Sequence, residues 1–246
     1  MIHQKYRVLS ISIALFFMAF HVSGQKRSTA KISNLGGFDT RNYHFGVQLS
    51  VNSADFYMDQ KFDPMFQDSL ISLQNFSQPG FNIAIIGALH FNKNWSLRII
   101  PGISPKERKF TYNFLESDGT ILPYDKVISS FYIDVPVLIK YRTDRINNFA
   151  AYVIGGGQIS RDMASQEKVK NELASFEDQV IKIERLDFLL SAGGGFDFFL
   201  PYFKFGIELK MVYGLKNILI QDNTQFSSPI ESLRSRNFVL SFTFEG

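Results

Sequence analysis

The chain has 246 residues and no cysteine, which excludes disulfides, thiolate metal sites and a cysteine nucleophile. Its 26 lysine and arginine residues are nearly balanced by 23 aspartate and glutamate residues. Two of the basic residues, Lys5 and Arg7, lie close to the N-terminus, so the rest of the chain is almost neutral. A nucleic-acid partner therefore has little electrostatic support.

Residues 1–24 have the pattern of a cleavable signal peptide. Two basic residues precede an apolar run over residues 8–20, and small residues follow it. The run is too short for a typical membrane-spanning helix, which needs about 20 apolar residues. We therefore expect an exported protein, with residues 25–42 as a flexible periplasmic segment and residues 43–246 as an outer-membrane β-barrel.

Strict alternation of side-chain character defines the expected strands. It is clearest from Ser130 onward, where Phe131, Ile133 and Val135 share one face and Asp134 lies on the other. A period of two over about ten residues suits a tilted strand that crosses a bilayer. In chain order, we predict strands over residues 43–52, 81–92, 95–114, 130–142, 149–157, 186–193, 203–211 and 237–244.

The third of these strands is irregular. Pro101 and Gly102 predict a bend or bulge, after which Phe110, Tyr112 and Phe114 alternate weakly with polar residues. The connections alternate in length along the chain. Long segments follow the first, third, fifth and seventh strands, at about 54–78, 115–128, 158–185 and 215–234.

This asymmetry is typical of one fold class. It predicts an all-β, eight-stranded antiparallel transmembrane β-barrel of the outer-membrane type, with four long extracellular loops and short periplasmic turns. A soluble lipocalin-like barrel is the alternative, but its interior would be apolar. Here small and charged residues lie opposite the phenylalanine and leucine rows, which favours the cell outer membrane. The last strand, with Phe238, Phe242 and Phe244, resembles the aromatic signal read by outer-membrane insertion machinery.

Eight strands enclose an interior just wide enough for side chains. Opposite charges in so narrow a space should pair, because an unpaired buried charge is costly. We therefore expect a plugged lumen without a diffusive pore. Its structural charge network is predicted to comprise Arg98, Asp134, Lys140, Asp187, Asp197, Lys204, Glu208 and Lys210.

Little in the sequence points to catalysis. His44 and His90 should face inward, but two isolated histidines are more often packing residues than metal ligands. The glycine runs at 155–157 and 193–195 open no helix of a βαβ unit, so close backbone approach explains them better than phosphate binding. We predict no catalytic residue, no cofactor, no metal and no enzymatic activity.

Several stretches resemble the PorT family (SprT in gliding bacteria), a barrel protein of the type IX secretion system of Bacteroidetes. They are HFGVQLSVNSADF, SLRIIPGIS, DVPVLIKYRTDRINNFAAYVIGG, FFLPYFKFGIELKM and SLRSRNFVLSFTFE, which are distributed from residue 44 to residue 245, along nearly the whole mature chain. The family-signature positions among them are His44, Phe45, Gly46, Pro101, Gly102, Pro136, Lys140, Tyr141, Pro201 and Tyr202.

The resemblance implies an outer-membrane component of protein secretion and gliding motility that acts as an assembly or accessory factor, rather than as the conduit. Its expected partners are outer-membrane lipid and other type IX secretion components, met through the 54–78 and 160–184 loops; we expect no nucleic acid and no small-molecule substrate. A stand-alone outer-membrane adhesin or ligand-binding barrel and a lipid-active enzyme remain the alternatives.

Overall fold

The computed structural model describes residues 33–61, 70–116, 118–169, 171, 175, 178–222 and 224–246. The expected signal peptide and residues 25–32 lie outside this part of the chain. Within the described ranges, no helix has the length and hydropathy needed to cross a membrane.

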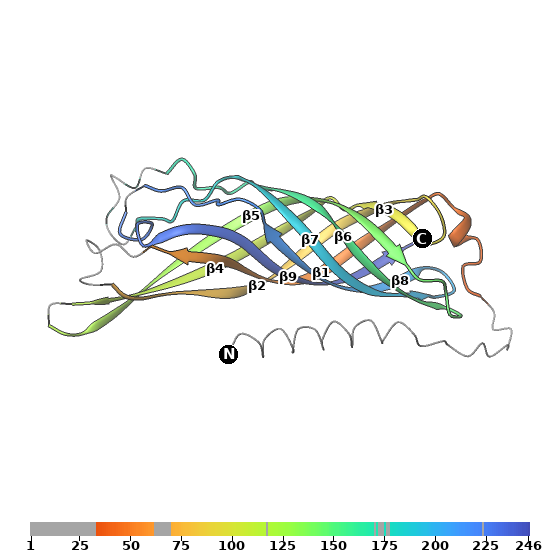
Figure 1. The fold of residues 1–246 in the computed structure, drawn as a ribbon, viewed down its shortest axis with the longest axis horizontal. Coiled ribbons are helices and arrows are strands. Elements are labelled where there is room, and N and C mark those ends of the chain that lie inside the picture. Colours follow the sequence, from red (N-terminus) through yellow and green to blue (C-terminus); the bar gives the residue numbers. More distant parts are fainter. Residues whose placement is uncertain are drawn as a thin grey trace, which may run out of the picture. The chain divides into compact units, whose positions relative to one another are not determined.

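The described chain folds into one closed antiparallel sheet (Figure 1). Strand β1 pairs with both β2 and β9, so the sheet closes on itself as a barrel. The strands are β1 (Tyr43–Gln60), β2 (Leu70–His90), β3 (Trp95–Ile99), β4 (Gly102–Leu115), β5 (Ile121–Arg142), β6 (Phe149–Asp162), β7 (Leu186–Phe199), β8 (Lys204–Gly214) and β9 (Ile230–Glu245).

Strands β3 and β4 share one place in the ring, because both pair with β2 on one side and with β5 on the other. The break between them falls at Ile100 and Pro101, where the sequence predicts a bend. The backbone stays hydrogen-bonded there: the Ile85 N–H donates to the Pro101 carbonyl and the Ile100 N–H to the Pro136 carbonyl, at 2.9 and 3.0 Å. The ring therefore has eight strand positions, as predicted.

Apolar side chains face outward around the end of the barrel that has the short turns. Leu209 is 60% exposed, whereas its neighbours Glu208 and Lys210 are 0% and 4% exposed. This polarity, apolar outside and charged inside, is the one that a bilayer demands. Exposed aromatic side chains gather near the short turns, as in the girdle of a membrane interface: Tyr43, Phe91, Trp95, Tyr141 and Tyr202.

The strands are longer than the sequence analysis predicts. Residues 54–78 were expected to form a loop, but β1 continues to Gln60 and β2 begins at Leu70. Likewise, the connection expected at 115–128 shrinks to five residues, because β5 begins at Ile121. The alternation persists in these extensions with its polarity reversed, so a search for outward-facing apolar residues misses them.

Strand β4, the second half of the predicted third strand, shows this reversal most clearly. Phe110, Tyr112 and Phe114 point into the barrel and are 0%, 0% and 8% exposed, while the polar residues between them face outward. Above the apolar belt the outer face of the wall meets water, so the apolar face turns inward as in a soluble barrel. The interior is thus apolar at this end, whereas the sequence analysis expects small and charged residues inside.

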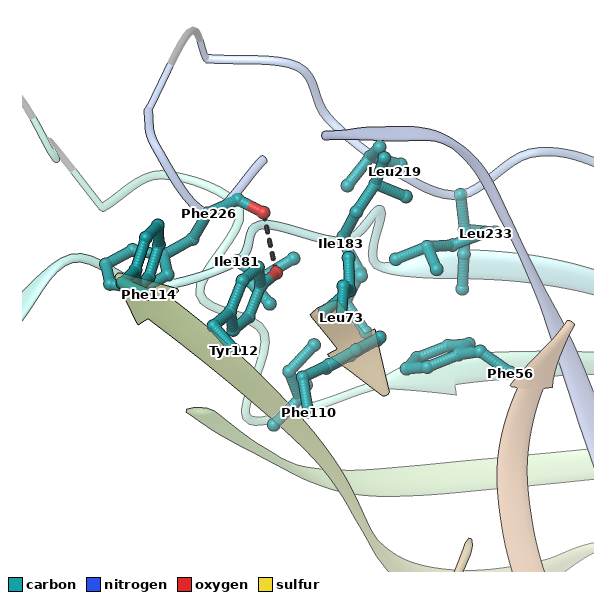
Figure 2. Packing of buried hydrophobic residues seen from close by; sticks show 13 residues of the cluster. Phe56, Leu73, Phe110, Tyr112, Phe114, Ile181, Ile183, Leu219, Phe226 and Leu233 are labelled. Atoms are coloured by element: carbon teal, nitrogen blue, oxygen red, sulfur yellow. Dashed lines mark hydrogen bonds between the residues drawn. The ribbon is translucent and has the colours of Figure 1, made fainter. Parts of the chain in front are cut away.

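The two long connections after β6 and β8 complete this apolar interior (Figure 2). Ile183 of one connection forms a bridge with Leu219 of the other. The Tyr112 hydroxyl donates a hydrogen bond of 2.6 Å to the carbonyl of Phe226. We call this cluster the extracellular plug: Phe56, Leu73, Phe110, Tyr112, Phe114, Ile128, Ile181, Ile183, Ile218, Leu219, Phe226, Ile230 and Leu233.

Residues 33–42 of the segment expected to be flexible pack against the opposite end of the barrel. A 3-10 turn over Phe38–Thr40 places the Phe38 ring 3.6 Å from the His44 ring and 6.0 Å from the Phe199 ring, between centroids. The Asn34 N–H donates to the Asn148 side chain at 2.9 Å. One buried aromatic ring thus brings a segment without periodicity into contact with the barrel.

Candidate functional site

Seven buried charged side chains form one continuous chain of alternating sign through the lumen. It runs Lys140, Asp197, Lys204, Glu245, Arg98, Glu208 and Lys210. Arg98 lies at its centre, with one Nη 2.9 Å from a Glu208 oxygen and the other 3.0 Å from a Glu245 oxygen. Lys210 completes that end, 3.4 Å from Glu208. All seven are less than 5% exposed, so solvent screens these pairs little.

The other half of the chain is equally tight. Lys140 Nζ lies 2.8 Å from Asp197, and Lys204 Nζ lies 2.8 Å from Glu245 and 3.9 Å from Asp197. Each carboxylate therefore has at least two cationic neighbours. Taking a charged side chain out of water has a large free-energy cost, and only close pairing with opposite charges can offset it. The charge chain links side chains of β3, β5, β7, β8 and β9 across the lumen.

The two remaining predicted network residues lie apart from this chain. Asp134 accepts hydrogen bonds from Lys106 Nζ at 3.1 Å and from the Ser160 hydroxyl at 2.5 Å. Asp187 is 1% exposed and makes no ion pair within the described part of the chain. The alternation in the sequence predicts that all eight residues face the lumen, but it does not predict which of them pair with one another.

The predicted network leaves out several charged lumen residues of the described chain. One of them is Glu245, whose carboxylate links Arg98 to Lys204. Its place in the alternation of the last strand was the available signal. Others are Lys106, Arg108 and Arg142, which lie on the inward faces of β4 and β5, and Asp162 on that of β6.

Tyr152 links the charge chain to the barrel wall. Its hydroxyl donates to Glu208 at 3.1 Å, and Lys140 Nζ lies 3.5 Å from its ring centroid. The ring fits because Gly195 lies beneath it: a Cβ at that position would come within 2.7 Å of the Tyr152 hydroxyl. The second glycine run thus serves close packing, as the sequence analysis expects.

The periplasmic mouth is closed by a second ionic group. Asp39 lies 2.7 Å from both Arg142 and Arg145. Burial raises the pKa of Asp39, but hydrogen bonds and attraction from the two arginines outweigh it, so the net pKa lies below the usual value. The carboxylate is therefore ionised at neutral pH and holds residues 33–42 against the barrel.

The signature positions have varied surroundings. His44 is buried, and Phe45 is 69% exposed toward lipid. Gly46 and Gly102 lie where a Cβ would collide with the neighbouring strand. Pro136 lies on the inward face of β5, Tyr141 packs on Trp95, and Pro201 and Tyr202 form an exposed turn. The three phenylalanines of the expected insertion signal, Phe238, Phe242 and Phe244, alternate on the outward face of β9.

The described residues give little support for a metal site. No group of three or more histidine, aspartate or glutamate side chains there could hold an ion. His44 and His90 do meet, with ring centroids 4.7 Å apart, but Phe38 stacks on His44 and fills the space beside it. We assign them to packing of the periplasmic mouth.

Three obstructions block a free passage through this lumen. They are the packing of Phe38 on His44 at the periplasmic mouth, the charge chain and the extracellular plug. The cavity between Gln48, Asp134 and Lys210 measures about 20 Å³, room for about one water molecule. We expect the purified barrel to give no stable open current in a planar bilayer, in contrast to a general porin measured in parallel. A steady ohmic conductance would contradict the closed lumen.

The closed antiparallel ring, the lipid-facing belt and the charged interior define a small outer-membrane β-barrel. Residues 24–219 match the model of the family described as outer membrane protein beta-barrel domain. The chain belongs to this family and resides in the cell outer membrane. No curated protein matches the chain.

Solved structures with a similar arrangement of strands include OprG from Pseudomonas aeruginosa, with 12% identity over 83% of this chain and 95% of that chain and a TM-score of 0.42. AlkL, determined in DMPC lipid bilayers, has 14% identity over 91% and 96%, also with a TM-score of 0.42. The outer membrane protease OmpT from Escherichia coli has 11% identity over 89% and 99%, with a TM-score of 0.37.

Proposed function

We propose that this barrel is a non-enzymatic accessory or assembly factor of the type IX protein secretion and gliding machinery, and that it works through protein contacts. The resemblance of five stretches to the PorT family carries the secretion role. The blocked lumen is the structural observation that favours contact over conduction, because a conduit for folded cargo needs an open path.

The extracellular extension offers a surface for such contacts. Strands β4 and β5 continue beyond the belt as a hairpin (Figure 1), and its tip exposes Leu115, Ile121 and Leu122. Exposed apolar side chains in water, gathered at one place, commonly mark protein interfaces. Of the two loops first expected to bind partners, 54–78 is largely barrel wall, so this hairpin tip replaces it in the proposal.

Deletion of the gene in its native host tests the secretion role. We expect cargo proteins that carry type IX C-terminal domains to remain cell-associated, and the intact gene to restore their export. Unimpaired export would refute the role. Surface binding that is lost in the deletion strain while export continues would instead favour the adhesin alternative.

A substitution at the hairpin tip tests the contact surface. Ile121→Ser together with Leu122→Ser should weaken partner binding, since truncated interface anchors typically cost more than about 1 kcal/mol each. Export should fall while the barrel still reaches the outer membrane. Glu116→Gln, at the same tip, is the matched control. Normal export by the double variant would remove the tip from the proposal.

A further inference from the structure

The upper half of strand β5 is paired with a neighbouring strand on one side only. On that side it pairs with β4 from Ile121 to Asp134, whereas its pairing with β6 on the other side begins at Tyr132, opposite Asp162. Residues 121–130 therefore form a free strand edge, in the part of the hairpin that β4 and β5 extend beyond the belt (Figure 1). Such an edge presents backbone N–H and C=O groups that can pair with another chain.

The Asp162 side chain ends the ladder between β5 and β6. Its carboxylate accepts a hydrogen bond from the Phe131 N–H at 3.1 Å and another from the Ala164 N–H at 2.9 Å. The Met163 N–H donates to the Phe131 carbonyl at 2.8 Å, and above this point no described residue makes a backbone hydrogen bond with β5 on this side. The connection after β6 thus turns away and leaves the edge open.

The hydrogen bonds at Phe131 also determine which backbone groups face the open side. In an antiparallel strand both backbone groups of one residue point to the same side, and successive residues alternate. Because Phe131 points toward β6, Asp125, Val127 and Ser129 direct their N–H and C=O groups to the open side as well. Pro123 has the same direction, and β4 pairs through it, as expected where the missing N–H would face away from β4.

The barrel has a second opening between extended strands, and there the edges are bridged. Strands β1 and β2 also separate above the belt. The Asn75 side-chain amide of β2 donates to the Phe56 carbonyl of β1 at 2.6 Å, and the Gln60 amide of β1 donates to the Leu73 carbonyl of β2 at 3.0 Å. Among the described residues, no side chain bridges the β5 edge in this way. It is therefore the edge that is available for pairing.

We propose that the free edge of β5 accepts an extended segment of a partner protein as an added strand. Hydrogen bonds to the main chain of Asp125, Val127 and Ser129 supply the affinity, and alternate side chains of the segment supply the specificity. One face of the added strand lies beside Val127, which is 52% exposed, and the other beside Ile128 of the extracellular plug. Aliphatic side chains fit best next to these two residues. This inference rests on the proposed function, because it names how the barrel makes its protein contact.

A second copy of the barrel does not fit this edge. Two copies in one membrane are related by a rotation axis along the membrane normal, and their strands are each tilted by about 35–45° from it. Such a rotation makes the two β5 strands cross at twice the tilt, so their backbone groups cannot align as a ladder. A segment of another protein has no such restriction on its direction.

The test uses the intact protein in the outer membrane of its native host. Because the chain has no cysteine, Ser129→Cys gives one labelling position, on the outward face beside the edge. A benzophenone maleimide attached there on intact cells, followed by irradiation, should give one cross-linked product with a partner protein. Val127→Pro in this background removes an edge N–H and puts a ring in the path of the added strand. We expect it to lower the yield at least about tenfold.

Two further variants complete the test. Asp125→Pro, nearer to the hairpin tip, should lower the yield as Val127→Pro does. Val127→Thr is the matched control, because it keeps the N–H and a β-branched side chain, and should retain the product. All variants should keep the heat-resistant folded band of the wild type on gels, since proline is tolerated where its missing N–H faces an open edge.

The inference fails if no product forms, if the product is a dimer of the barrel, if both proline variants retain it, or if Val127→Thr loses as much. Export is measured separately in the deletion strain and in the proline variants. If deletion blocks export but the proline variants export normally and keep the product, only the strand-addition inference is refuted. If export survives deletion, the secretion role is refuted, and the cross-linking still decides whether the edge binds a partner.

Discussion

Replacing Arg98 by methionine is expected to destabilise the folded barrel by about 3–5 kcal/mol, the usual cost of removing one partner of a buried ion pair. Arg98 is 1% exposed and bridges Glu208 and Glu245. Without the guanidinium, two carboxylates share the lumen with fewer cations, and water cannot reach them. Urea-induced unfolding of the barrel in lipid vesicles, followed by tryptophan fluorescence, measures the loss.

A second substitution separates the ionic effect from the change of shape. In Arg98→Met with Glu245→Gln, one negative charge is removed along with the positive one, so much of the stability should return. Lys109→Met removes a cation of an exposed pair with Asp125 and should cost less than about 1 kcal/mol. If Arg98→Met proved no more costly than Lys109→Met, the charge chain would not support the barrel.

The membrane-crossing part of the fold follows from the sequence because a single rule holds there. Lipid lies outside and a narrow polar lumen inside, so alternation gives both the strand and the direction of each side chain. The residues from Phe131 to Arg142 obey this rule without exception. The same rule brings the predicted charges into the lumen.

The extracellular extension does not follow because the surroundings change along one strand. In β5 the period of two continues upward from Ser130, but the outer face now meets water and the inner face meets the plug. The sequence shows alternation on both sides of this boundary and does not mark where the bilayer ends. The sequence pattern around Phe110 therefore resembles that around Phe205, although Phe110 is buried inside the barrel and Phe205 faces outward.

The pairing within the lumen is also beyond sequence reasoning. Arg98 and Glu245 lie 147 residues apart and meet across the interior, not along one strand. Their contact depends on the stagger of every strand between them, which no local pattern encodes. The docking of Phe38 is a similar case, since one ring in a segment without periodicity finds a site made by distant strands.

Two adjacent glycines of β6, which the sequence cannot tell apart, have different surroundings. A Cβ at Gly156 would collide with the backbone carbonyl of Val137 on β5, and backbone cannot move aside as a side chain can. Gly156→Ala is therefore expected to cost about 3 kcal/mol, the upper end for overpacked sites, because β5 and β6 must separate. Urea-induced unfolding in vesicles gives the value.

Gly157→Ala is the matched control, because a Cβ there meets nothing within 4 Å and its backbone needs no left-handed conformation. That variant should unfold within about 0.5 kcal/mol of the wild type, as an open surface position does. The first glycine is thus required by the tight approach of two strands, and the second is not. Equal stability of the two variants would show that β5 and β6 are less closely packed at this level than the barrel geometry requires.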